Sequence, residues 1–307
     1  MGQYVLRRLL MLIPVLFGVS IIVFSIMQLT PGDPALLALG EFAPPEQLEA
    51  LREQLGLNDP PHVQYLRWVS KAAQLDLGQS LRSRRPVTEE IASRLPATGQ
   101  LALYAVTFAA LIGIPAGVIS ATRPNSLVDN AVTVAALAGV SMPVFWQALM
   151  LMIIFSVHYN LLPSSGMVDG WKSFVLPVVT LGTSTTAGIA RMTRATMLEA
   201  LQQDYVRTAR AKGLSERVVV YRHTLRNALI PVVTTIGLQT GALLAGAVLT
   251  ERVFTFRGVG HALAYGFETR DYAVLQVLIM MAALIYILVN MVVDIAYAAI
   301  DPRVRVR

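Results

Sequence analysis

The feature that most constrains this chain is a set of long, continuous apolar runs separated by charged segments. A helix rises about 1.5 Å per residue, so about 20 apolar residues cross a hydrocarbon core about 30 Å thick. Runs that meet this length occupy residues 9–29, 97–121, 131–157, 174–192, 228–250 and 274–300. They are continuous rather than alternating, which argues against a transmembrane β-barrel. We therefore predict an all-α membrane protein with a transmembrane helix in each run.

Composition narrows the class of protein further. Charged residues make up 14% of the 307 residues, whereas soluble domains carry about 25%. The chain has no cysteine and only four histidines without ligand spacing, so we expect no disulfide and no metal site. The net charge of +6 fits the positive-inside rule of membrane proteins, so we expect no nucleic-acid partner.

The distribution of basic residues predicts the orientation. Both termini lie on one side if all the runs cross. Charges in a segment as long as 30–95 have little influence on orientation. Without that segment, 14 Lys and Arg lie on the side of the termini and 4 on the other. We therefore expect cytoplasmic termini, although Arg82, Arg84, Arg85 and Arg94 lie on the opposite side, close to the second run.

This orientation divides the chain into four parts. Residues 1–29 form the N-terminus and first span, 30–95 an extracytoplasmic insert, 96–300 a five-helix transmembrane core with a cytoplasmic loop at 193–226, and 301–307 a cytoplasmic tail. In the insert, Pro44-Pro45, Pro60-Pro61 and Pro86 precede helical patterns and predict short amphipathic helices. The insert is either a locally packed segment or a contact surface for an external partner.

The third, fourth and fifth runs contain small and polar residues together with prolines, which indicates the interior of a helix bundle. Two interpretations of the polar residues stay open: hydrogen bonding between helices, or a translocation pathway. The pathway interpretation assigns its lining to Ser141, Trp146, Gln147, Thr183, Thr186 and Gln239. Asp294 is the one clear carboxylate that we expect within a span, serving in structural pairing or in a proton relay.

A basic loop follows the fourth run and has the pattern of a helix, a glycine turn and a second helix. We expect the first helix to continue the fourth span from Glu199 to Arg210 and to end at Gly213. Ser215 is the expected N-cap of the second helix, which we expect to end near His223. Such a short helix needs a docking partner. The candidate docking residues are Arg207, Ala209, Lys212, Gly213, Leu214, Ser215, Glu216, Arg217, Val218, Tyr221, Arg222 and His223.

At this loop the chain resembles the permease subunits of binding-protein-dependent ABC importers, in the dipeptide, oligopeptide, nickel and glutathione branch. The resemblance rests on residues 204–213 and 223–228. It extends to Pro31-Gly32-Asp33-Pro34, to residues 76–80, to Gly258-Val259-Gly260, to Arg270-Asp271-Tyr272 and to residues 301–305. Arg207 and Arg226 depart from the wider family motif, whose Glu and Pro they replace, in the way typical of the peptide branch.

The resemblance implies a type I ABC-importer permease fold in the bacterial inner membrane. It also implies four partners: a homologous permease in a heterodimer, two ATP-binding subunits, and an extracytoplasmic solute-binding protein. The chain has no Walker loop, so ATP and Mg would be used by the ATPase subunits, and we expect no catalytic residue here. Peptides are the leading substrate class, with glutathione and nickel complexes open. The alternatives are an ion-coupled secondary transporter acting alone and a membrane scaffold without transport.

Overall fold

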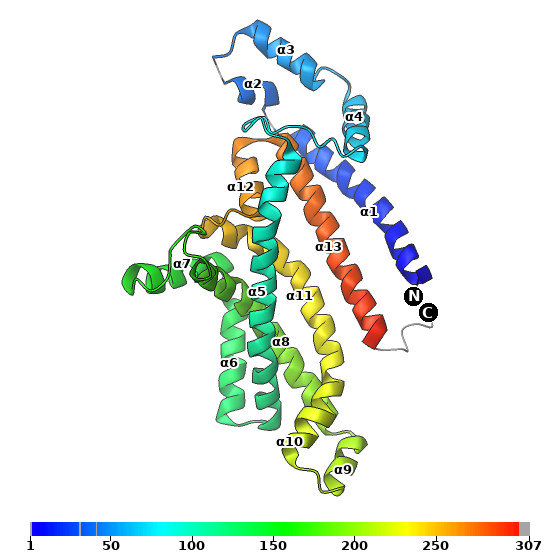
Figure 1. Cartoon of the computed structure of the whole chain (residues 1–307), viewed down its shortest axis with the longest axis vertical. Helices are drawn as coiled ribbons and strands as arrows, with labels where there is room; N and C mark the ends of the chain where they lie inside the picture. Colours follow the sequence, from blue (N-terminus) through cyan, green and yellow to red (C-terminus); the bar gives the residue numbers. More distant parts are fainter. Residues whose placement is uncertain (1, 31, 41, 301–307) are drawn as a thin grey trace. The chain divides into compact units, whose positions relative to one another are not determined.

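The computed structural model describes residues 2–30, 32–40 and 42–300 (Figure 1). Side chains are described for residues 10–30, 32–40, 42–243 and 246–292. The tail at 301–307, Pro31 and the side chain of Asp294 therefore lie outside the described residues. Within the described residues the secondary structure is helical, apart from an isolated bridge between Gln79 and Pro86.

The chain forms two compact units that do not follow the divisions predicted from the sequence. Unit 1 consists of Met1–Ala97 and Arg257–Ile287, and unit 2 of Thr98–Phe256 and Leu288–Arg307. The predicted insert thus belongs to the same unit as the first helix and a segment near the C-terminus. The helices Val87–Thr122 and Tyr272–Ile300 each cross a boundary between the units. This occurs because a helix is defined by hydrogen bonds along the chain, whereas a compact unit is defined by packing.

Unit 1 begins with α1 (Gly2–Leu29) and the short helices α2 (Pro34–Leu39), α3 (Pro45–Leu55) and α4 (Pro61–Ala73). The predicted helix starts after Pro44 and Pro60 are confirmed. Proline suits the first position of a helix because its fixed φ is already helical and no N–H bond is lost there. At α2 the carboxylate of Asp33 accepts a hydrogen bond from the Ala35 N–H at 2.9 Å, which caps the helix.

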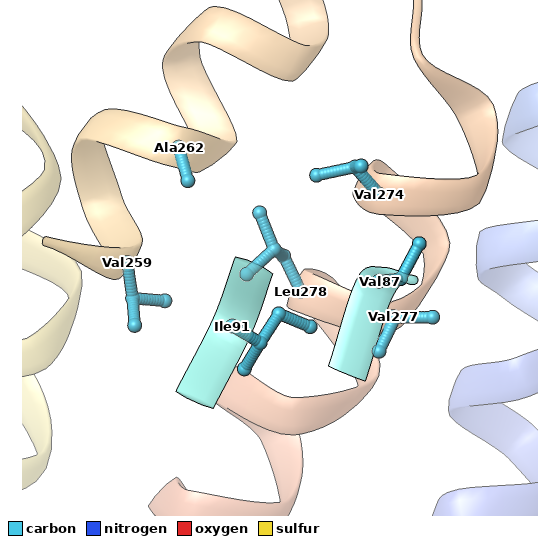
Figure 2. Close-up of a cluster of buried hydrophobic side chains, with 7 residues drawn as sticks. All are labelled: Val87, Ile91, Val259, Ala262, Val274, Val277 and Leu278. Carbon is cyan, nitrogen blue, oxygen red and sulfur yellow. The ribbon is translucent and has the colours of Figure 1, made fainter. Parts of the chain in front are cut away.

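The rest of unit 1 packs around one apolar cluster. It joins the start of α5 (Val87–Thr122), α12 (Val259–Thr269) and the first turns of α13 (Tyr272–Ile300). Figure 2 shows its buried side chains converging from these three helices: Val87, Ile91, Val259, Ala262, Val274, Val277 and Leu278. Burying each Val or Leu contributes about 1.5–3 kcal/mol, so the cluster holds helix ends that are far apart in sequence.

An aromatic cluster fixes α4 to α1. The rings of Phe24 and Tyr65 meet edge to face with centroids 5.4 Å apart, and Trp68 stacks on Phe24 at 6.3 Å. The hydroxyls of Ser20 and Tyr65 share a hydrogen bond of 2.8 Å. Edge-to-face and offset aromatic pairs are favourable, so part of the predicted insert is anchored to the first apolar helix and is not a free loop.

Unit 2 contains the second part of α5 and a series of helices that ends before Arg257. Its elements are α6 (Leu127–Ser141), α7 (Val144–Met152), η1 (Ile153–His158), α8 (Lys172–Leu201), α9 (Asp204–Ala211), α10 (Glu216–Val218), η2 (Val219–Thr224) and α11 (Leu225–Val253). The most buried of the apolar helices is α8, with 61% of its apolar window buried. At Gly117 of α5, an added Cβ would lie 2.5 Å from the Cβ of Thr193. The backbones of α5 and α8 therefore approach as closely as only glycine allows.

Two of the predicted spans are bent. Among the described residues, four helices are long and apolar enough to cross a membrane, or up to six if each bent pair is one span. The run at 131–157 is not one straight helix, since α6 and the segment Val144–His158 meet at 103°. The bend occurs because Pro143 disfavours the helical conformation of Met142, whose φ and ψ are −78° and 127°. In the fifth run, Glu216–Leu243 and Gly246–Val253 differ by 53°.

Candidate functional site

The loop between α8 and α11 has the helix–glycine–helix pattern expected from the sequence. The first helix is interrupted, however, because α8 ends at Leu201 and α9 begins only at Asp204. Gly213 adopts φ +74°, the left-handed conformation that side chains disfavour. Across this turn, Arg210 Nε donates to Glu216 Oε1 at 2.7 Å. The turn is thus fixed by backbone geometry and by an ion pair.

The second helix of the loop does not end near His223, as the sequence led us to expect. The three residues of α10 pass directly into the π-helical turn η2 and then into α11, so the chain stays helical from Glu216 to Val253. The Thr224 hydroxyl donates to the Val219 carbonyl at 3.0 Å, a bond that replaces part of the ladder loosened by the wider turn. Ser215 occupies the predicted N-cap position without a side-chain cap.

One face of the loop is anchored in unit 2. Val206 and Ala209 of α9 pack against Val219 of η2 in a small buried cluster. The next residue, Val220, belongs to a second cluster that connects the loop to α5, α8 and α11, formed by Val118, Ala121, Met197, Ala200 and Ala228. The loop is therefore packed against the ends of three long helices.

The opposite face of the loop is exposed. Tyr221 is 56% exposed and Leu214 is 39% exposed, so this face presents apolar as well as charged side chains. The other predicted docking residues on this face are also exposed: Arg207, Lys212, Gly213, Ser215, Glu216, Arg217 and Arg222. Val218 and His223 are half-buried, and Ala209 faces the interior. Figure 1 shows α9 and α10 at the end of unit 2 farther from α7.

A buried ion pair close to this loop escaped the sequence reasoning. The Asp129 side chain in the first turn of α6 is 3% exposed and accepts hydrogen bonds from Arg194 Nε and Nη2, both at 2.7 Å. Ser120 Oγ and the Asn125 N–H also donate to this carboxylate. The cluster ties α5, α6 and α8 together. The sequence signal for this ion pair is an acid and a base just outside the ends of two predicted spans, where they count only as loop charges.

A second buried carboxylate lies near the C-terminal end of α11, the end away from the loop. Glu251 is fully buried, and Thr98 Oγ1 donates to its Oε1 at 2.6 Å. Asp294 is therefore not the only acid within the apolar helices, because Asp129 and Glu251 both lie in candidate spans. The third predicted span begins at residue 131 and the fifth ends at residue 250, so Asp129 and Glu251 fall just outside these spans.

The predicted pathway residues all lie in unit 2 but differ in how they are held. Thr183 and Thr186 donate their hydroxyls to backbone carbonyls of their own helix, at 2.5 and 2.8 Å. The amide of Gln239 lies against Gly188, where a Cβ would come within 2.5 Å of its Nε2.

At the bend between α6 and α7, by contrast, Ser141 and Trp146 are exposed and Gln147 is half-buried. The structure therefore shows hydrogen bonds within α8 for Thr183 and Thr186, a contact between helices for Gln239, and an accessible group at the bend.

In unit 1, two of the sequence motifs meet. Ser80 Oγ donates to Asp271 Oδ2 at 2.5 Å, although the two residues are 191 positions apart. The same carboxylate accepts weaker bonds of 3.4 Å from the Leu81 and Val274 N–H groups. Asp271 therefore caps the start of α13 and fixes the turn that precedes α5. These motifs have a structural reason: they close unit 1.

A cavity of about 600 Å³ lies between α1, α3, α4 and the start of α13, all in unit 1. Its wall includes the pair between Arg52 and Asp33, with an Nη2–Oδ2 distance of 2.5 Å. Hydrogen bonds to Asp33, together with charge attraction, raise the pKa of the Arg52 guanidinium. Among the described residues, no group of three His, Cys, Asp or Glu side chains could hold a metal ion.

Comparison with known proteins covers both units. Residues 1–103 match the N-terminal family of binding-protein-dependent transport system membrane components, and residues 113–306 match the family described as binding-protein-dependent transport system inner membrane component. A dipeptide transport system permease protein of Alkalihalophilus pseudofirmus is 45% identical over 332 residues, covering 99% of this chain and all of that protein. A glutathione transport system permease protein of Escherichia coli K12 is 46% identical over 305 residues, covering 99% of each.

Solved structures with the same fold include an inward-facing methionine ABC transporter, MetNI, with a TM-score of 0.60 at 20% identity. The match covers 71% of this chain and 99% of that one. An amino acid ABC transporter with histidines matches with a TM-score of 0.53 at 18% identity, covering 70% and 94%. The fold, the motifs and the relatives agree: this chain belongs to the family of inner-membrane permease components of binding-protein-dependent ABC importers, in the peptide branch.

Proposed function

We propose that this chain and a homologous permease form, as a heterodimer, the membrane pathway of an ABC importer for small peptides or glutathione. The observation that carries the proposal is end-to-end similarity, at 45–46% identity, to a dipeptide permease and a glutathione permease. The similarity extends through both compact units, so it includes the proposed pathway and the insert. This favours the same type of cargo as in those relatives. Nickel complexes are a less supported cargo.

The exposed face of the 207–223 loop is the proposed docking site for one of two ATPase subunits. ATP and Mg would bind to those subunits, and this chain would act as a transport subunit without catalytic residues. Support comes from the continuous helix between Glu216 and Val253, since force on Tyr221 would pass directly into α11. ATP can drive such a change only if it favours one state of the bundle over another.

The proposed pathway runs along Ser141, Trp146, Gln147, Thr183, Thr186 and Gln239. The exposure of Ser141 and Trp146 in the single chain supports a second permease that would cover the bend between α6 and α7. In this arrangement the termini and the 193–226 loop are cytoplasmic. The 30–95 insert faces the solute-binding protein outside the bacterial inner membrane.

Reconstitution tests the proposal directly. Vesicles containing the sister permease, the two ATPases and this chain should accumulate dipeptide or glutathione only when ATP and solute-binding protein are supplied. Vesicles with this chain alone are the control and should accumulate nothing. Uptake by the lone chain on an ion gradient would replace the proposal with a secondary transporter, and failure of the complete complex on every peptide tested would remove the assigned cargo.

A further inference from the structure

The arginines of unit 1 fall into two groups according to their partners. Three of them are paired with carboxylates at N–O distances of 2.5–2.7 Å: Arg52 with Asp33, Arg67 with Asp59 and Arg94 with Glu90. Among the described side chains of unit 1, five arginines form no such pair: Arg82, Arg84, Arg85, Arg257 and Arg270. Three of these, Arg82, Arg84 and Arg270, line a cavity of about 260 Å³. We refer to this cavity as the arginine pocket.

The one acid in the wall of the arginine pocket is already engaged. Asp271 accepts the Ser80 hydroxyl and two backbone N–H groups, as described above. Three arginines thus line one small cavity with a single carboxylate, Asp271, which leaves an excess of positive charge in its wall. Arginine forks match oxyanions with several acceptor oxygens, such as phosphate. An anion of this kind would relieve the repulsion among the three cations.

The pocket is held in shape by its backbone. The Ser80 N–H donates to the Arg85 carbonyl and the Arg84 N–H to the Ser80 carbonyl, both at 3.0 Å, which closes a tight loop. Arg84 and Arg270 both have left-handed backbones, with φ of 55° and 51°. Non-glycine residues rarely adopt this conformation unless the surrounding structure requires it. The guanidinium of Arg270 lies against the backbone of Gly32, where an added Cβ would collide with it.

The position of the pocket identifies the anion. Its three wall segments each adjoin the end of a candidate span: residues 34–38 follow α1, 81–84 precede α5, and 269–271 precede α13. In the proposed orientation these segments would lie near the level where phospholipid head groups meet the hydrocarbon core. Small-molecule pockets span about 300–1,000 Å³, so this cavity suits a head-group phosphate better than a peptide. Exposed Leu37 in its wall and Phe267, two residues before Thr269, offer apolar surface for an acyl chain.

We infer that the arginine pocket binds the phosphate of an anionic phospholipid. This inference does not depend on the transported cargo or on the partner subunits. It also gives a role to Arg82 and Arg84, whose expected position outside the cytoplasm is not explained by the positive-inside rule.

The test uses the full-length chain purified in neutral detergent. Phosphatidylglycerol and phosphatidylcholine with identical acyl chains are titrated in, and retained lipid is counted by native mass spectrometry. Wild type should retain phosphatidylglycerol selectively. Arg82→Gln and Arg270→Gln should each weaken retention roughly fivefold, as expected for about 1 kcal/mol per basic residue near an anionic surface. Arg85→Gln is the matched control, because Arg85 lies in the same loop, is exposed and does not line the pocket.

Three further measurements decide between sources of the anion. The Arg82→Lys and Arg270→Lys variants should keep most of the selectivity. Millimolar inorganic phosphate should displace the lipid only weakly, and binding of inorganic phosphate with the affinity of the lipid would make this a small-anion site and overturn the inference. Equal retention of the two lipids, or equal loss in Arg85→Gln, would also overturn it. The inference would also be overturned if Arg82→Gln retained as much lipid as wild type but no longer copurified with the solute-binding protein. Because Arg82 is exposed, its variant should stay folded and remain informative if Arg270→Gln does not.

Discussion

At the residue scale, buried carboxylates hold together segments that the chain itself does not connect. Asp129 accepts hydrogen bonds from two of the three donor nitrogens of Arg194 and from the Ser120 hydroxyl, so three helices share one acid. A buried ion pair is costly to form, and losing one partner leaves an uncompensated charge. The value of this cluster therefore lies in fixing the geometry beside the loop rather than in adding net stability.

This cost predicts an asymmetry between single and double variants. Arg194→Met should strongly lower the unfolding temperature of the purified chain, because it leaves the Asp129 carboxylate without a cation. Asp129→Asn combined with Arg194→Met should recover much of that loss, since neither charge is then left unpaired. Thermal unfolding in detergent is the measurement. A double variant as unstable as the sum of the two single variants would show that the pair is not coupled.

Ser80 provides a second prediction, in unit 1. Ser80→Ala removes the 2.5 Å donor from the buried Asp271 carboxylate and should destabilise the chain by about 1–3 kcal/mol, the cost of leaving a buried acceptor unsatisfied. Ser83→Ala is the control, since the Ser83 hydroxyl makes only longer bonds at the surface, donating to Glu90 Oε2 at 3.2 Å and accepting from the Arg85 N–H at 3.4 Å. Equal stability of the two variants would refute the closing role of Ser80.

At the element scale, the loop of residues 202–224 combines a rigid turn with an anchored face. Gly213 has open space around it, so a side chain there would meet no obstacle. Only its backbone conformation, φ +74°, resists substitution. A distorted turn would displace α10 relative to α9 and so disturb the cluster of Val206, Ala209 and Val219 that joins the two sides of the turn.

We therefore expect Gly213→Val to lower peptide uptake more than ATP hydrolysis in the complete transporter, because a β-branched residue costs about 1–2 kcal/mol in this conformation. Gly213→Asn, which tolerates φ > 0, should retain most uptake. Gly170→Val imposes a similar strain at φ +56° in a loop far from 213 in sequence and also without close neighbours. Equal uptake to hydrolysis ratios in the two valine variants would argue against the loop as a lever.

At the scale of the whole molecule, the polar residues of unit 2 separate into packing contacts and accessible groups. Thr183, Thr186 and Gln239 are engaged with their own helix or with α8, whereas Gln147 lies at the bend between α6 and α7. The bend interrupts the helix within an apolar run of the chain. Such breaks are tolerated in membranes where they line a cavity.

Leucine substitutions test whether these groups carry the cargo. Gln147→Leu should reduce uptake in the assembled importer without reducing recovery of the complex, because it removes a polar group from the proposed pathway and changes the side-chain volume little. Gln239→Leu should reduce uptake as well and, since its amide packs on Gly188, should also lower thermal stability. Wild-type uptake by both variants would remove these residues from the pathway.

Much of the helical structure follows from local sequence. The apolar runs, the helix starts after Pro44 and Pro60, and the glycine turn at 213 depend on hydrophobic length and on backbone preferences that act within a few residues. The motif residues also identified the family. These features could be predicted because the membrane requires local backbone satisfaction in every span.

What the sequence by itself determined is therefore the class of protein, the approximate spans and the position of the loop. Only the tertiary structure decided which side chains meet: Ser80 with Asp271, Asp129 with Arg194, Thr98 with Glu251, and the three arginines around one cavity. The reason is physical. Helix formation depends on neighbours in the chain, whereas the pairing of buried polar groups depends on how helices far apart in sequence pack, and no local pattern encodes that packing.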